Sequence, residues 1–423
     1  MAPSTHAHKR ATRLVAVAAA ACLALTACGD DSDASSGTDS GTTSNLTGEP
    51  IKIGYAASQS GPQASNGLNG AGVAQAWAKY TNAHGGVDGH PVEFEIVDTK
   101  NTVPGATSVV QNFLDNDESD AILLTDLVAE GAMGKMLTDV DTPILSGGGS
   151  SDLLWANVPG TFQPVSGSTY TVKAYVQVAR TAGGTKFAWA ACAEVAVCQE
   201  NGGKAIAYAK EVGLQTENVQ LFSASAANYT AECLSYVGKG VDVIAMNIGI
   251  ATGARVMADC LQQGYQGKWS MMNSGFDQAK VAEVSGAQTA GSSQGFPWWA
   301  DDPKVETYRQ AMKQYSPDTQ WQGGNTTSVW AMLELFKKAM ETAKPATIDR
   351  ASILTAMYAV KDETLGGLLP EPVTFTEGQP SKPVGCSWLF SYNAGDENPK
   401  SLPVEGTPGN GATGDLASTC IGY

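Results

Sequence analysis

The sequence predicts an α/β protein with two doubly wound lobes, each built on a parallel β-sheet. Short β-rich runs alternate with longer helical stretches at about 25 residues per unit, which is typical of βαβ crossovers. The alternation restarts near Val172. From Glu49 onward about 375 residues remain, which is too many for one compact core and suits two lobes. An apolar content of 43% is typical of a packed globular chain.

The N-terminus has the layout of a secretory signal. Three basic residues precede an apolar run over 14–25, which is too short to span a bilayer as a stable helix. The run ends in Leu25-Thr26-Ala27-Cys28, which resembles a bacterial lipobox. The resemblance implies a signal peptide over 1–27, lipidation of the Cys28 thiol, and no transmembrane helix in the mature protein. An ordinary signal cleaved nearby, with Cys28 an incidental thiol, is the alternative.

Residues 28–49 are expected to form a flexible tether between the lipid and the folded part. The segment is rich in Ser, Thr, Gly and Asp and has too few apolar side chains to form a core. Loss of residues 1–27 removes three basic residues and no acidic one, so the formal net charge of −16 becomes −19. Such a surface repels nucleic acid and anionic lipid, which excludes nucleic-acid binding.

Six cysteines remain in the predicted mature chain, an even number that indicates disulfides in an exported protein. Fifteen pairings are possible, and local spacing favours Cys192–Cys198, Cys233–Cys260 and Cys386–Cys420. The predicted helices with Cys233 and Cys260 flank one strand, which supports that pairing. No CxxC motif is present, so neither a metal nor a redox role is expected.

The predicted elements follow the chain in order. In the first half, strands are expected over 51–55, 92–97, 121–124 and 143–145, with helices over 71–82, 107–114 and 132–137. In the second half, strands are expected over 186–190, 219–222, 241–246, 269–272 and 295–298, with helices over 172–180, 205–212, 229–237 and 254–262. Helices over 304–314, 328–342 and 350–360 and a strand over 386–392 follow.

Several ordered motifs then resemble one family. They are 51–54 (IKIG), 60–62 (SGP), 82–92 (NAHGGVDGHPV), 98–100 (DTK), 143–147 (PILSG), 229–233 (YTAEC), 260–265 (CLQQGY) and 365–370 (LGGLLP). Together they resemble the type I solute-binding proteins of bacterial ABC importers, in the branched-chain amino acid and amide branch. The resemblance covers residues 50–423. It implies two α/β lobes joined by a three-crossing hinge, with lobe 1 formed by 50–163 and 298–378, and lobe 2 by 164–297 and 379–423.

The candidate ligand site lies where the strands end, because ligands of open parallel sheets bind beyond the carboxyl ends of the strands. The expected wall of lobe 1 is Gln59, Ser60, Leu127, Val128, Gly148, Gly149 and Ser150. The expected wall of lobe 2 is Glu194, Asn247, Ile248, Phe276 and Asp277. The glycine run over 147–149 would let a ligand approach the backbone, with a tight turn as the alternative.

The match to amino acid binders is incomplete at individual positions. Ser150 agrees with a ligand-contacting hydroxyl of the family, but Val128 stands where amino acid binders use a serine. Gly275 stands where they place an acid for the ligand ammonium, a role that Asp277 could take. The loop expected to carry an aromatic is bridged by two cysteines and carries Glu194 instead. An α-amino acid is therefore one possible ligand, beside amides, aromatic acids and urea-like compounds.

Enzyme chemistry is not expected. The G-x-S-x-G pattern at 291–295 lacks a histidine after the serine, and the two histidines outside the leader, His84 and His90, lie in a predicted turn. No phosphate-binding P-loop occurs, so any ATPase is a separate chain. The leading hypothesis is a monomeric, lipid-anchored receptor at the outer face of the cytoplasmic membrane, with an ABC importer permease as partner and no cofactor. A sensory lipoprotein without a transport role is the alternative.

Overall fold

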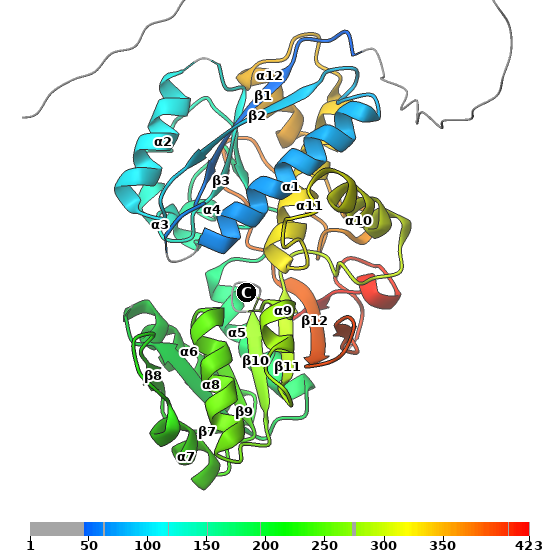
Figure 1. The fold of residues 1–423 in the computed structure, drawn as a ribbon. Helices are drawn as coiled ribbons and strands as arrows, with labels where there is room; N and C mark the ends of the chain where they lie inside the picture. Colours follow the sequence, from blue (N-terminus) through cyan, green and yellow to red (C-terminus); the bar gives the residue numbers. More distant parts are fainter. Residues whose placement is uncertain are drawn as a thin grey trace, which may run out of the picture. The chain divides into compact units, whose positions relative to one another are not determined.

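The computed structural model describes residues 46–61, 64–116, 118–149, 151–194, 196–272, 276–404 and 406–422. The predicted signal peptide, Cys28 and most of the predicted tether lie outside these residues, as do Ser150 and Gly275. Within the described part of the chain, helices and strands alternate as the sequence predicts, and the strands fall into two sheets (Figure 1).

The first sheet has the strand order β2-β1-β3-β4-β5, and all of its pairs are parallel. Its strands are β1 (Ile51–Ala57), β2 (Val92–Asp98), β3 (Ala121–Thr125), β4 (Ile144–Ser146) and β5 (Thr161–Phe162). The connecting helices are α1 (Ala64–Ala83), α2 (Val103–Asp115), α3 (Glu130–Met133) and α4 (Asp152–Trp155). Every residue of β1 except Lys52, and every residue of β3, is buried, as expected for strands with helices on both faces.

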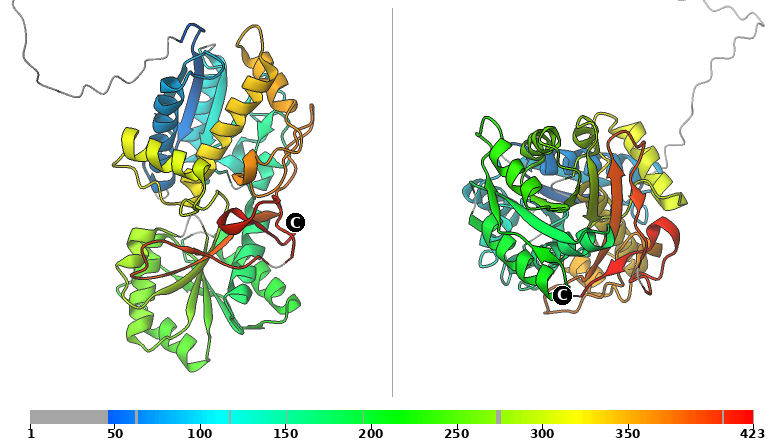
Figure 2. Two further views of the ribbon diagram at one scale, coloured as in Figure 1. Left: turned by 90° about the vertical axis from the view of Figure 1, so that its right-hand side faces the viewer. Right: turned by 90° about the horizontal axis from the view of Figure 1, so that it is seen from below.

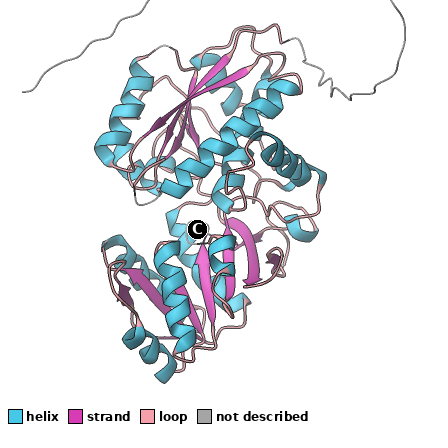
Figure 3. Ribbon diagram, viewed as in Figure 1, coloured by secondary structure: helices cyan, strands magenta, loops and turns pink. Residues whose placement is uncertain are grey.

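The second sheet has the path β13-β12-β11-β10-β9-β6-β7, with β8 also paired to β6 and β14 to β12. Its strands are β6 (Lys186–Cys192), β7 (Gln215–Thr216), β8 (Gln220–Phe222), β9 (Val243–Asn247), β10 (Lys268–Met272), β11 (Gln288–Ser293), β12 (Cys386–Asn393), β13 (Lys400–Ser401) and β14 (Thr419–Cys420). Its helices are α5 (Ser168–Thr181), α6 (Ala196–Glu211), α7 (Thr230–Gly238), α8 (Ile250–Gln262) and α9 (Gln278–Ala282). Strands β6 to β11 pair in parallel, whereas β12 is antiparallel to β11 (Figure 3).

The helices after β11 return to the first sheet. They are α10 (Pro303–Tyr315), α11 (Gly324–Ala343) and α12 (Arg350–Tyr358). Helices α10 and α11 pack against α1, and α11 also contacts β4 (Figure 1). The chain then enters β12 of the second sheet. It therefore crosses between the sheets three times, after β5, after β11 and before β12, as the predicted fold class requires. The lobe boundaries at 163, 297 and 378 stay predictions.

One expected strand is wrong. The run over 295–298 forms a bend and a turn, and the strand that precedes it is β11 (Gln288–Ser293). The aromatic side chains of this run enter the core instead, where Trp298 packs against Phe276 and Trp299. Pro297 has no N–H group to give to a sheet ladder. The helix expected over 132–137 is also shorter than predicted, because α3 ends at Met133 and turns follow.

A buried group of hydroxyls and amides joins the three crossings. The Tyr170 hydroxyl on α5 lies 2.7 Å from Ser387 Oγ on β12, and this oxygen lies 2.7 Å from Ser292 Oγ on β11. All three residues are fully buried. The Gln294 side-chain amide donates a hydrogen bond to the carbonyl of Ser166, which links the second crossing to the first. The segments on which any lobe movement depends are thus connected directly.

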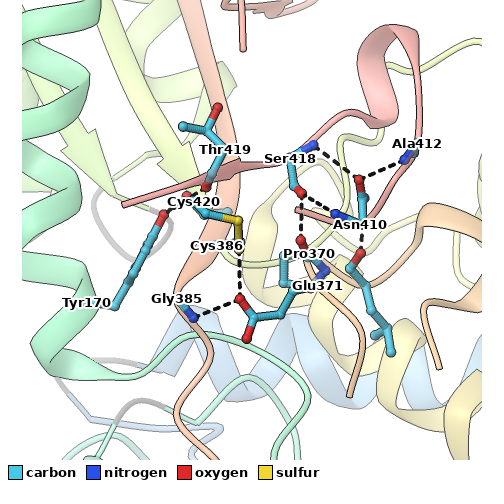
Figure 4. Close-up of a disulfide and its surroundings, with 12 residues drawn as sticks. Tyr170, Pro370, Glu371, Gly385, Cys386, Asn410, Ala412, Ser418, Thr419 and Cys420 are labelled. Carbon is cyan, nitrogen blue, oxygen red and sulfur yellow. Dashed lines mark hydrogen bonds between the residues drawn. A yellow bond between two sulfur atoms is a disulfide. The ribbon is translucent and has the colours of Figure 1, made fainter. Parts of the chain in front are cut away.

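The three disulfides of the structure are those predicted, Cys192–Cys198, Cys233–Cys260 and Cys386–Cys420. The last one fixes the C-terminal segment to the first residue of β12 (Figure 4). The ribbon of the C-terminal segment accordingly runs beside β12 (Figure 2). In the same segment, the Asn410 side-chain amide donates to the carbonyls of Gly367, Leu369 and Leu416 at 2.9–3.2 Å. The C-terminal segment therefore bonds both to β12 and to the loop that follows α12.

A partly buried carboxyl group between α1 and α11 predicts a pH dependence of stability. The Trp77 Nε1–H group donates to Glu334 Oε1 at 2.7 Å, and burial raises the pKa of Glu334 above its ordinary value. A raised folded-state pKa gives stability that is complete below the unfolded-state pKa, about 4.3, and is lost as pH rises through the folded-state value. We expect Glu334→Gln, which keeps an acceptor for Trp77, to become more stable relative to the natural protein between pH 5 and pH 8.

Urea unfolding of both proteins at the two pH values measures this difference. Glu341→Gln is the matched control on the same helix, because Glu341 is exposed and pairs only loosely with Lys337, at 3.9 Å. A relative stability of Glu334→Gln that is constant with pH, or that falls as pH rises, would contradict the prediction.

Candidate functional site

Three loops of the first sheet carry the predicted lobe 1 wall. They follow β1, β3 and β4, which are neighbours in the sheet and run parallel, so their carboxyl ends share one edge. The loop after β1 carries Gln59 and Ser60, the loop after β3 carries Leu127 and Val128, and the loop after β4 carries Gly148 and Gly149. The fold thus brings these six residues to one edge, as predicted. Whether they contact a ligand stays a prediction.

The loop after β1 is held by Asp98, the last residue of β2. Its carboxylate accepts hydrogen bonds from the backbone N–H groups of Gln59 (2.9 Å), Ser60 (3.1 Å) and Lys100 (2.8 Å), and from Ser60 Oγ at 2.6 Å. Partial desolvation alone would raise the pKa of Asp98. The hydrogen bonds from Ser60, Gln59 and Lys100 outweigh it, so the pKa of Asp98 lies below its ordinary value. Because the Ser60 hydroxyl proton already points at Asp98, Ser60 can offer a ligand acceptor lone pairs rather than a donor.

The loop after β3 is held by the buried Asp126. Its Oδ1 accepts from the N–H groups of Val128 and Ala129, both at 3.1 Å, and from Asn101 Nδ2 at 3.1 Å, while Oδ2 accepts from the Thr99 hydroxyl. The backbone N–H of Val128 is therefore occupied. Its side chain is 50% exposed, so Val128 presents methyl groups at this edge.

The glycine run after β4 is explained by packing. A Cβ on Gly147 would lie 2.0 Å from Thr125 Oγ1, and a Cβ on Gly149 would lie 2.1 Å from Trp155 Nε1. Gly149 also donates its N–H to Ser146 Oγ at 2.8 Å and accepts from Gln163 Nε2 at 2.6 Å. Gly148, with φ +93°, adopts the left-handed conformation that favours glycine. The tight-turn alternative thus accounts for all three glycines, and ligand contact by Gly148 and Gly149 is not required to explain them.

The predicted lobe 2 wall follows the neighbouring parallel strands β6, β9 and β10. After β6, Glu194 Oε1 accepts from the Ala224 N–H at 2.7 Å and from Ser223 Oγ at 2.9 Å. These hydrogen bonds lower the pKa of Glu194, which is exposed and ionised. Glu194 therefore already has a structural role in joining this loop to the one that follows β8.

The loops after β9 and β10 place one acid and several apolar groups at the same edge. Asn247 ends β9 and is half-buried, and Ile248 is 7% exposed. Phe276 is 6% exposed and packs against Trp298, Phe390 and Tyr392.

Asp277 is the N-cap of α9. Its Oδ1 accepts from the Lys280 N–H at 3.0 Å. Ser150 and Gly275, the two family positions compared at the sequence level, lie outside the described residues.

Sequence reasoning missed one residue of the lobe 1 edge. Leu153, in α4, is 70% exposed, the highest value among the large apolar side chains of the described residues that are exposed. Its Cδ1 would lie 3.6 Å from a Cβ on Gly131, which places it beside the loop that carries Val128. The segment Asp152–Trp155 contains two leucines in succession, and the sequence pattern alone does not indicate which of the two is exposed to solvent.

Other chemistry has an ordinary structural explanation in the described part of the chain. Glu371 lies beside Cys386 and Cys420, but both cysteines are in a disulfide and have no thiolate for a metal ion. The ring nitrogens Nδ1 of His84 and His90 contact the backbone carbonyls of Tyr80 and Glu49 at 2.7 and 2.8 Å. None of the helices described here has the length and apolar character needed to cross a membrane.

Comparison with known proteins identifies the class. The family model described as "Periplasmic binding protein" matches residues 50–397, and a search of curated protein sequences finds no match. Solved structures with a similar fold include a leucine-binding protein from Thermotoga maritima, with a TM-score of 0.66 and 14% identity, covering 83% of this chain and 97% of that one. Another is a branched-chain amino acid ABC transporter protein from Thermus thermophilus with bound valine (TM-score 0.67, 16% identity, 85% and 96% covered).

A third is a fatty acid ABC transporter substrate-binding protein from Thermomonospora curvata (TM-score 0.66, 16% identity, 85% and 92% covered). At these identities the likeness establishes the fold, a two-sheet α/β architecture shared by type I solute-binding proteins. The family match covers most of the chain, and the chain belongs to the periplasmic binding protein family. The resemblance deduced from the ordered sequence motifs is confirmed.

Proposed function

We propose that this protein is an exported, lipid-anchored receptor that captures a small solute between its two lobes and delivers it to an ABC importer permease. The observation that carries the proposal is the family match over residues 50–397, together with two sheets in which the carboxyl ends of parallel strands carry the predicted walls. Ligand that contacts both walls would favour the closed arrangement of the lobes, and the closed form would be the one that the permease recognises. The amino acid and fatty acid ligands named for proteins of similar fold define the first solutes to test.

Thermal unfolding of the exported protein against amino acids, short amides, urea, aromatic acids, fatty acids and sugars tests ligand capture. A specific ligand at about 100 times its dissociation constant adds about 2.7 kcal/mol to the free energy of unfolding. A stabilisation by one chemical class supports the proposal. If no class stabilises the protein and mass spectrometry of the denatured protein finds no retained ligand, the proposal is wrong. Deletion of the gene should also abolish uptake of the identified ligand, and unchanged uptake would contradict delivery to an importer.

The lipid anchor has its own test at Cys28. We expect the natural protein to sediment with membranes and to incorporate a labelled fatty acid, whereas Cys28→Ala should be released or should keep its leader. The sequence has a lipobox-like pattern that ends in Cys28, and lipidation of the thiol needs that cysteine. Unlabelled natural protein, recovered as a soluble species, would favour the ordinary secretory signal.

A further inference from the structure

The two acids of the lobe 2 wall are poorly placed to capture a ligand ammonium group. Glu194 is exposed and uses Oε1 for Ser223 and Ala224. Asp277 uses Oδ1 to cap α9 and lies near the Lys280 ammonium, which also pairs with Glu283 at 2.9 Å. An ion pair contributes strongly only when both partners are desolvated and well bonded, and exposed pairs contribute little.

The lobe 1 wall instead exposes two large apolar side chains. Val128 is 50% exposed and Leu153 is 70% exposed, although most leucines and valines of the described residues are buried. Both lie at the carboxyl edge of the first sheet, after the neighbouring strands β3 and β4. Gly131, one turn after Val128, would bring a Cβ to 3.6 Å from Leu153 Cδ1, so the two side chains border one surface.

The backbone that carries these side chains is fixed. Asp126 holds the N–H of Val128 at 3.1 Å. Glu130 Oε2 accepts from the Ser151 N–H and from Trp155 Nε1, both at 3.0 Å, and so holds both ends of α4. The apolar surface is therefore part of the built loop structure. On the lobe 2 wall, Ile248 adds a further apolar residue after β9.

From these placements, and resting on the proposed function, we infer that the ligand is a small molecule with a hydrophobic group and without an ammonium group. The hydrophobic group covers Val128 and Leu153 when the site is occupied. Covering the exposed part of the Leu153 side chain removes apolar surface from water and is expected to account for about tenfold in affinity.

Calorimetric titration of the natural protein with graded probes tests the inference. The probes are monocarboxylates from butanoate to octanoate, the corresponding neutral amides, and the matched pair leucine and 4-methylpentanoate, which differ only in the amino group. We expect affinity to rise about fourfold per added methylene in either the monocarboxylate series or the amide series. We also expect 4-methylpentanoate to bind more tightly than leucine.

Leu153→Ser locates the apolar contact, with Leu234→Ser as the matched control. Leu234 is a 51% exposed leucine on α7, one of the helices that connect strands of the second sheet. We expect Leu153→Ser to weaken binding of the longest probe about tenfold and to flatten the chain-length dependence, with Leu234→Ser unchanged. Because Leu153 is mostly exposed, the unfolding temperature of the variant should match that of the natural protein, which separates a binding effect from a folding effect.

Three outcomes would overturn the inference. Tenfold tighter binding of leucine, or of another ammonium-bearing solute, than of its deaminated analogue would refute it and leave the proposed receptor function intact. If the affinity of Leu153→Ser for the probes depends on chain length as in the natural protein, Val128 and Leu153 do not contact the ligand, and the inference is wrong. Binding of neither these probes nor any member of the wider solute panel, by protein in which mass spectrometry finds no retained ligand, would refute both the inference and the proposed function.

Discussion

Replacement of Cys386 and Cys420 by alanine is expected to lower the free energy of unfolding by about 3–4 kcal/mol. The disulfide closes a loop with a sequence separation of 34 residues, so it removes much conformational entropy from the unfolded chain. In the folded protein it also fixes β14 against the start of β12 (Figure 4). Urea unfolding of the natural protein and of the double variant, both without reductant, measures the difference.

The Cys192–Cys198 disulfide provides the matched control. Its sequence separation is 6, so the same replacement there should cost about 2 kcal/mol. Equal losses in the two double variants would contradict the loop-length argument. A loss at Cys386–Cys420 well above 4 kcal/mol would instead indicate that the hydrogen bonds of the C-terminal segment are lost together with the disulfide.

Those hydrogen bonds connect the C-terminal segment with the third crossing. The Ser418 hydroxyl donates to the carbonyl of Pro370, and the Ile421 N–H donates to the carbonyl of Gly385 at 3.1 Å. Gly385 in turn donates its N–H to the Glu371 carboxyl group at 3.0 Å. Burial raises the pKa of Glu371, which favours the protonated form beside the Cys386 sulfur, an atom that has no proton of its own. The C-terminal segment is therefore well placed to stiffen the crossing.

Most of the fold could be predicted because its strands are apolar and its helices follow them at regular intervals. The strand β11, with the sequence QTAGSS, gives only a weak strand signal in the sequence. It is buried because its polar groups find partners: Ser292 Oγ lies 2.7 Å from Ser387 Oγ, and the Thr289 hydroxyl donates to the carbonyl of Tyr392 at 2.8 Å. Partners so distant in the sequence leave no local signal for a strand. The neighbouring aromatic run over 295–298 has the apolar pattern of a strand but does not form one.

Helix α1 shows the same limit at its start. The predicted helix begins at 71, but the structure begins it at Ala64, and the intervening glycines disfavour a helix on local propensity. Tertiary contacts require them: a Cβ on Gly67 would lie 2.3 Å from the Ser58 carbonyl oxygen, and a Cβ on Gly70 would lie 2.4 Å from the Tyr55 hydroxyl. Close approach of α1 to β1 thus outweighs propensity.

The candidate site could be placed from the sequence but its chemistry could not. Parallel strands bring their carboxyl ends to one edge, so the loops that form the walls follow from the strand order. What each side chain offers depends on its partners. Glu194 and Asp277 have carboxylates suited to an ammonium group, yet both are used locally, and the exposure of Leu153 depends on how Glu130 holds α4.

Arg350→Ala is expected to lower the free energy of unfolding by about 3 kcal/mol. Arg350 is the first residue of α12, and its guanidinium group donates to the carbonyls that end α2 and the loop after it: Phe113 (3.2 Å), Leu114 (3.3 Å), Asn116 (2.9 Å) and Ser119 (3.0 Å). The carbonyls in the last turn of α2 have no partner within that helix, and a cation there also complements the helix dipole. Hydrogen bonds from a charged donor contribute about 1.5–3 kcal/mol each, and water would replace part of them in the variant.

Arg350→Lys separates charge from geometry. Lysine keeps the positive charge, but its single ammonium group cannot reach four carbonyls in the planar arrangement of a guanidinium group, so we expect it to recover less than half of the lost stability. Lys210→Ala is the control for an exposed cation in the last turn of a helix, α6, and should cost less than about 1 kcal/mol. Equal stability of Arg350→Lys and the natural protein would show that charge alone joins α12 to α2. Equal stability of Arg350→Ala and the natural protein would show that water replaces the guanidinium group without loss of stability.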